Sequence, residues 1–164
     1  MTTDDSIIKE QQRLQQKHDI ENHFDIVSST RIDRVKHYAL HYAKYVGRMF
    51  RENESKHITQ TLTDSLLVSL SAANALNQSL WIEPNLGLDH ESFDAQIYAD
   101  YSGIFADSAE KIDHMESFLE AMKGSNYRLF WLAFQALQRS DVDPVNQINK
   151  RRIEISKRAV YADK

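Results

Sequence analysis

Cysteine is absent from this 164-residue sequence, and proline and glycine occur only two and four times. The absence of cysteine excludes disulfides, thiolate zinc sites and cysteine nucleophiles. So few turn-forming residues disfavour an all-β fold, whereas apolar residues recur at three- and four-residue spacing along much of the chain. We therefore predict an all-α fold, a helical bundle of four or more core helices.

Long apolar runs and a charge bias are also lacking. No run approaches the roughly 20 apolar residues that cross a bilayer, and the start of the chain, MTTDDSIIKEQQ, is polar and acidic rather than signal-like. The 24 acidic and 20 basic residues are mixed along the chain, so no overall field favours nucleic acid or anionic lipid. We expect a cytoplasmic protein with neither a membrane segment nor a nucleic-acid partner.

The chain divides into a polar N-terminal arm or helix, residues 1–30, and a single helical domain, residues 31–164. The arm has too few apolar residues to bury a face of its own. Thr30, with Asp33 three residues on, predicts the start of a helix over 31–51. A second apolar-periodic segment, 57–80, follows after a short break, so the two helices should form an antiparallel hairpin.

In the second half of the domain, the sequence predicts a long connection over 81–106, followed by a third helix that starts at Asp107. The inner stripe of that helix is formed by Ile112, Met115, Leu119 and Met122. A fourth helix, YRLFWLAFQALQ, is apolar nearly all round, which predicts a central position and self-association. Asp143 and Pro144 then start a final basic helix over 144–160.

A basic stripe runs along RIDRVKHYALHYAKYVGRMF, residues 31–50. It consists of His37, His41, Lys44 and Arg48. The two histidines have the i, i+4 spacing that lets imidazoles share a transition metal, although no third ligand is evident. The stripe could equally be a solvated face, or it could bind an anion such as a nucleotide phosphate directly. The sequence leaves these three alternatives open.

The segments HYALHYAKYVGRMF and LTDSLLVSLSAANAL resemble the helical hairpin of MazG-like all-α nucleoside triphosphate pyrophosphohydrolases, over residues 31–82. The resemblance implies a helical dimer or tetramer that cleaves a nucleotide between its α and β phosphates with magnesium. It also implies that Asn74 faces the nucleotide base. The alternative for Asn74 is a core amide that forms hydrogen bonds across the hairpin.

In this family, paired carboxylates on the two helices hold the magnesium ions. Placed on this chain, the first pair falls on His41 and Lys44 and the second on Thr61 and Asp64, so that only Asp64 matches. One carboxylate cannot hold a magnesium cluster, which weighs against the cofactor that the resemblance implies. Magnesium would need relocated ligands, for which Glu110 and Asp113 of the third helix are the candidates.

Three hypotheses follow. The first is a MazG-like helical protein degenerate at the magnesium site, with a nucleotide-binding or oligomeric regulatory role. The second is an active pyrophosphohydrolase with relocated carboxylates, and the third is a helical protein-interaction module. Under the first, Lys44 or His41 should pair with Asp64 and occupy the place of the metal.

Overall fold

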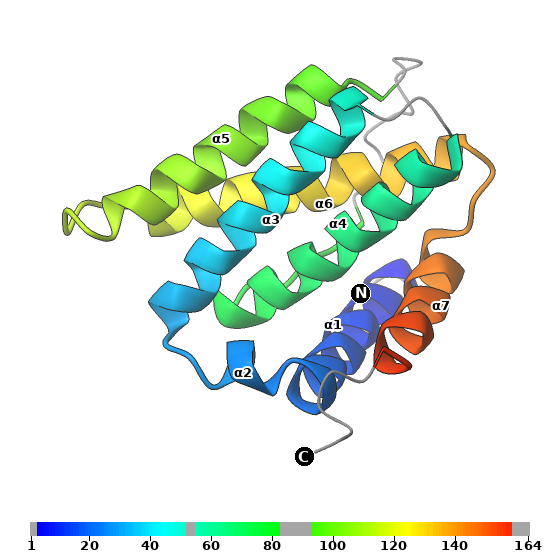
Figure 1. Ribbon diagram of the computed structural model, residues 1–164, viewed down its shortest axis with the longest axis horizontal. Coiled ribbons are helices and arrows are strands. Elements are labelled where there is room, and N and C mark those ends of the chain that lie inside the picture. Colours follow the sequence, from blue (N-terminus) through cyan, green and yellow to red (C-terminus); the bar gives the residue numbers. More distant parts are fainter. Residues whose placement is uncertain (1–2, 52–54, 83–92, 159–164) are drawn as a thin grey trace.

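The computed structural model describes residues 3–51, 55–82 and 93–158, and over these ranges it contains seven helices and no strand (Figure 1). The helices are α1 (Thr3–Asn22), α2 (Phe24–Val27), α3 (Arg31–Arg51), α4 (Ser55–Ala75), α5 (Ala95–Lys111), α6 (Leu119–Arg139) and α7 (Pro144–Ser156). The all-α prediction is confirmed. Within the described ranges, no helix is long and apolar enough to span a membrane.

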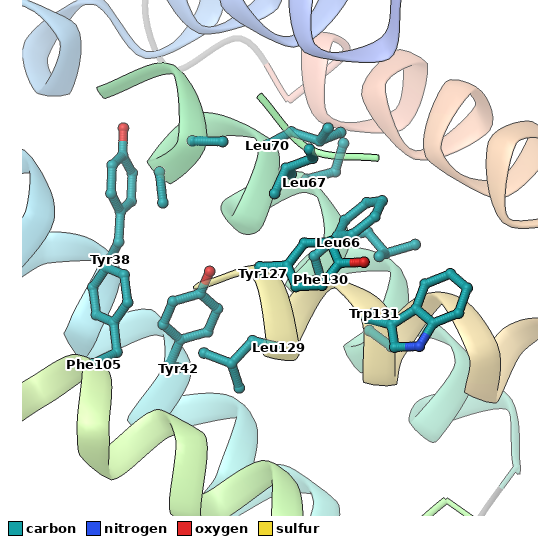
Figure 2. Packing of buried hydrophobic residues seen from close by; sticks show 14 of the residues in the cluster. Tyr38, Tyr42, Leu66, Leu67, Leu70, Phe105, Tyr127, Leu129, Phe130 and Trp131 are labelled. Atoms are coloured by element: carbon teal, nitrogen blue, oxygen red, sulfur yellow. The ribbon is translucent and has the colours of Figure 1, made fainter. Parts of the chain in front are cut away.

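The core lies where α3, α4, α5 and α6 meet (Figure 1). Tyr42 of α3 and Phe105 of α5 are fully buried, with ring centroids 5.1 Å apart, and they lie beside the apolar side chains of α6 (Figure 2). The Tyr42 hydroxyl donates a hydrogen bond to Asn126 Oδ1 at 2.7 Å, so the one polar group of this ring is satisfied. Truncation of such a ring costs about 3–5 kcal/mol.

Two predicted helix starts are confirmed. Thr30 accepts a hydrogen bond from the Asp33 backbone N–H at 3.1 Å and donates to the Asp33 carboxylate at 2.6 Å, which fixes the first turn of α3. Asp143 accepts from two backbone N–H groups at the start of α7, with Pro144 at the first helical position.

The prediction for the third helix is wrong. The helix α5 occupies much of the expected connection, begins after the N-cap Asp94 and ends at Lys111. Met115, assigned to the inner stripe, is 96% exposed and has a left-handed backbone with φ of 57°. The Glu116 N–H donates a hydrogen bond to the Lys111 carbonyl at 3.1 Å, which closes the turn after α5. The left-handed residue in such a turn is usually a glycine. The sequence gives no such signal because the left-handed residue is a methionine.

The fourth predicted helix is central, as expected, but it is longer than predicted. Residues 119–126, which come before the predicted segment YRLFWLAFQALQ, also belong to α6. Trp131 is only 6% exposed because α4 and α5 pack along α6 within the same chain. The apolar surface of α6 therefore gives no reason for self-association. The helix α4 is buried at least as fully, through small residues such as Ala72, Ala73 and Ser65.

The helix α1 is not a free arm, because it packs against α4 and α7 (Figure 1). Its inner face repeats at helical spacing and contains one apolar residue, Ile8, among polar ones. The buried polar residues of this face are Gln11, Gln12, Gln15, His18 and Asp19. Amides replace apolar groups here, which is why a search for apolar periodicity overlooked the face.

Candidate functional site

A cavity of about 670 Å³ opens between α1, α2, α3, α4 and α7. Four of the predicted site residues line it, namely His37, His41, Lys44 and Asp64. The hairpin positions these side chains: α3 and α4 run antiparallel, so that the Lys44 end of α3 lies beside Asp64 (Figure 1). Side chains from outside the hairpin complete the walls, chiefly those of α1 and α7.

Asp64 is paired with arginine. Arg151 of α7 donates from Nε to Asp64 Oδ1 at 2.6 Å and from Nη2 to Oδ2 at 3.2 Å, and Arg48 Nη1 lies 3.8 Å from Oδ2. The predicted pairing with Lys44 or His41 is therefore wrong, because a planar guanidinium fits both carboxylate oxygens whereas an ammonium cannot. The broader expectation that a cation neutralises Asp64 is confirmed, with a different residue as the partner.

Lys44, His41 and His37 form a hydrogen-bonded chain along one side of α3. Lys44 Nζ lies 3.0 Å from His41 Nδ1, and His41 Nε2 lies 2.9 Å from His37 Nε2. Because an ammonium can only donate, His41 Nδ1 accepts and its proton lies on Nε2. That proton points at His37 Nε2, so the remaining proton of His37 lies on Nδ1.

Both imidazoles of this chain are neutral near pH 7. Burial lowers the pKa of His41 to about 3, and the charges of Lys44 and Arg48 act in the same direction. Burial and Lys44 also lower the pKa of His37. The pKa of Lys44 itself is lowered, first by burial and then by Arg48. The lowered pKa values of the two histidines agree with the proton positions given above, because only a neutral imidazole can accept a hydrogen bond from Lys44.

The α1 side of the cavity carries titratable groups that sequence reasoning missed. Burial lowers the pKa of His18 to about 4, with smaller effects from His23 and Arg152. Burial also raises the pKa of Asp19, although its carboxylate accepts hydrogen bonds from Ser71 at 2.6 Å and from Gln15 at 2.8 Å. The spacing of these polar residues follows one helical face, but a solvated face has the same spacing, so the sequence carries no signal that the face is buried.

Charge is unevenly distributed along the cavity. The cations Lys44, Arg151 and Arg158 line it together with Asp64, which two arginines neutralise. The other acidic residues come from α1 and α2, and Asp25 and His23 act on His37 rather than on Lys44. The Lys44 end is therefore suited to an anionic group, and the α2 end to neutral or donor groups.

The other predicted site residues lie elsewhere. Arg48 adjoins Asp64 but does not line the cavity. Asn74 donates to the Gln12 carbonyl at 3.0 Å and accepts from Gln12 Nε2 at 3.4 Å, so it joins α4 to α1 rather than spanning the hairpin. This geometry matches the structural role for Asn74 and gives no support to contact with a base.

The candidate metal ligands do not converge. Glu110 bonds to His114 at 2.8 Å, and Asp113 pairs with Lys36 at 2.6 Å, both at exposed positions near the end of α5. Among the residues that the structure describes, no group of three or more histidine, aspartate or glutamate side chains could hold a metal ion. Among the described side chains, Asp64 is therefore paired with arginines, and no second carboxylate joins it as a metal ligand would.

Comparison of the chain with protein-family models, with curated proteins and with solved structures found no match.

Proposed function

We propose that the protein binds a nucleotide phosphate directly through cationic side chains, in a MazG-like helical hairpin that is degenerate at the magnesium site. In this proposal, Lys44 and Arg151 contact the phosphate at the Asp64 side of the cavity. The sugar and base extend toward α2, where Ile26 and Val27 offer apolar contact and Asp25 offers a hydrogen-bond acceptor. A volume of about 670 Å³ lies in the range of small-molecule sites.

The observation that carries the proposal is the pairing of Asp64 with Arg151 at 2.6 Å. In the family that the hairpin resembles, a carboxylate at this position holds magnesium. Here, a guanidinium already supplies the positive charge, and a second cation at the same oxygens would be repelled. Phosphate recognition therefore falls to fixed side chains, as in arginine-based phosphate sites.

Isothermal titration calorimetry tests this proposal with the adenine and uracil nucleoside mono-, di- and triphosphates, in EDTA and then in magnesium. We expect binding in EDTA that magnesium does not strengthen, and loss of at least tenfold in affinity for Lys44→Met. Lys56→Met is the matched control, because this lysine is exposed at the start of α4 and does not line the cavity. The proposal is overturned by an absence of binding to all six nucleotides, or by affinity that appears only with magnesium.

The rival function, an active magnesium-dependent pyrophosphohydrolase, has its own test. Pyrophosphate release from nucleoside triphosphates that requires magnesium and disappears in Asp64→Asn would favour the rival. We expect no magnesium-dependent release of pyrophosphate. We also expect Asp64→Asn to leave the binding of magnesium unchanged, because a single carboxylate that is already paired with arginine is too poor a ligand set.

A further inference from the structure

The hydrogen-bonded chain formed by Lys44, His41 and His37 lies on the wall of the cavity. Two neutral imidazoles joined directly through Nε2 atoms at 2.9 Å, with an ammonium at one end, form a continuous path for protons. The path runs from Lys44 Nζ, through both rings of His41 and His37, to His37 Nδ1. All three residues line the cavity.

We propose that this path is a proton relay, and that His37 acts as the general acid in a metal-independent hydrolysis of phosphate monoesters bound in the cavity. The proposal rests on the proposed phosphate-binding function and adds a reaction and a substrate class to it. It concerns esters rather than anhydrides, because an alkoxide leaving group needs a proton whereas pyrophosphate leaves as a stable anion.

The relay solves a problem that a single histidine in this cavity would have. An isolated imidazole must carry a positive charge before it can act as an acid, and burial beside Lys44 opposes that charge. In the relay, no imidazolium has to form, because each ring gives up one proton as it receives another. The positive charge stays on Lys44 until the leaving group takes a proton at the other end.

The step balances as follows. Water attacks phosphorus as the bond from phosphorus to the alcohol oxygen breaks, and the departing oxygen takes the proton from His37 Nδ1. His37 Nε2 takes the proton of His41 Nε2, and His41 Nδ1 takes one from Lys44, which becomes a neutral amine. The proton of the attacking water passes to the product phosphate. Uptake of a proton from bulk water at His37 Nδ1 then reverses the three transfers and restores the ammonium.

The surrounding charges suit each end of the path. Arg48, Asp64 and Arg151 lie near the Lys44 end, from which the relay draws its proton. His23 and Asp25 from α2 act on His37, at the end where the leaving alcohol would lie. Tyr45 lies 3.1 Å from His41 Nδ1 and offers a second donor to the same atom, which holds the ring in the required tautomer.

The test compares two phosphate monoesters in EDTA with the full chain. Adenosine 5′-monophosphate has an alkoxide leaving group that needs a proton, whereas p-nitrophenyl phosphate releases a stable phenolate that does not. We expect His37→Gln and His41→Gln to lower the rate with the nucleotide by roughly 10²–10⁴-fold and the rate with p-nitrophenyl phosphate by less than about threefold. His114→Gln, an exposed histidine outside the cavity, is the matched control and should change neither rate.

The outcomes separate the relay from the binding proposal. Binding of adenosine 5′-monophosphate without any hydrolysis overturns the relay and leaves the binding proposal standing. Equal losses with both esters also overturn the relay, because they indicate a structural role for the histidines. Hydrolysis without measurable binding in the calorimetric experiment overturns the placement of the phosphate at Lys44. Thermal unfolding of each variant, matched to the wild type within a few degrees, confirms that the fold is retained.

Discussion

Arg151 on α7 holds both carboxylate oxygens of Asp64 on α4, 87 residues away in the sequence, at 2.6 and 3.2 Å. Arg151 is also within 2.9 Å of Glu154 on its own helix, so its guanidinium is fixed from two sides. This pair attaches α7 to the hairpin at the point where the cavity has its cationic end. It is a contact between helices, and in the proposed function it is also the charge that takes the place of a metal at Asp64.

Arg151→Met should lower the free energy of unfolding by roughly 2–3 kcal/mol, because it leaves the mostly buried Asp64 with the longer Arg48 contact, at 3.8 Å, in place of two close hydrogen bonds. Urea denaturation measures the change. Arg128→Met, at an exposed position on α6, is the control and should stay within about 0.5 kcal/mol of the wild type. Removal of both charges in Asp64→Leu/Arg151→Met should recover part of the loss, and a double variant that is worse than the sum of the singles would contradict this account.

The hairpin was predictable from sequence because its determinants are local. The apolar stripe predicts Val35 and Tyr42 on the buried face of α3, and Thr30 marks where the helix begins, but Phe50, which the same stripe includes, is 63% exposed and Met49 is buried instead. The partner of Asp64 was not predictable, because nothing local links positions 64 and 151. Patterns along one helix indicate which side is buried, but not which distant side chain meets it.

The helix α1 was misjudged for a related reason. Its buried face bonds through amides: Gln12 accepts from the Leu80 N–H at 2.8 Å, and Gln11 and Gln15 accept from Arg152 at 2.6 and 2.8 Å. Each of these buried amides accepts a hydrogen bond from a group that is distant in the sequence, on α7 or just after α4. From the sequence, the same glutamines are indistinguishable from a solvated surface, and the cavity wall that they support was therefore overlooked.

Met115→Gly should raise the free energy of unfolding by about 1 kcal/mol. The left-handed backbone of Met115, with φ of 57°, costs a side-chain-bearing residue about 1–2 kcal/mol, and the greater entropy of glycine in the unfolded chain offsets part of the gain. Met115→Ala is the matched control, because it removes the exposed side chain but keeps the unfavourable backbone. Chemical denaturation that showed equal stabilisation by alanine and glycine would mean that the side chain, rather than the backbone, is responsible.

Acid should destabilise the protein through its buried histidines. The pKa values of His18 and His41 are lowered to about 4 and about 3 in the folded state, against about 6.5 in an unfolded chain. The unfolded chain therefore binds more protons as the pH falls below about 6.5, so stability is fully present above that pH and is lost progressively toward pH 4. Asp19, whose pKa burial raises, acts in the opposite direction at the acidic end of this range.

The comparison that isolates the histidines is between the wild type and His18→Gln/His41→Gln. Melting temperatures from pH 7.5 to 4 should fall less steeply for the double variant, because its glutamines take up no protons on unfolding. His114→Gln should follow the wild-type profile, since that histidine is exposed. Parallel profiles for the wild type and the double variant would show that other groups cause the acid sensitivity.

Self-association, if it occurs, should use the outer face of α3 rather than α6. Leu40 and Phe50 are 70% and 63% exposed on the same side of α3, and the small residues Ala43 and Gly47 lie between them at helical spacing. A second copy could cover the two large side chains there, although the Arg51 guanidinium lies over Gly47 and would have to move for a close approach. We expect a dimer in light scattering at micromolar concentration.

The double variant Leu40→Glu/Phe50→Glu should be a monomer in the same experiment, and it should keep its fold, since both side chains are exposed within one chain. The matched control, Ile153→Glu, changes an apolar residue of similar exposure on α7 and should leave the dimer intact. A wild type that is monomeric at every concentration tested would contradict this prediction and rule out the oligomeric regulatory role among the hypotheses drawn from the sequence.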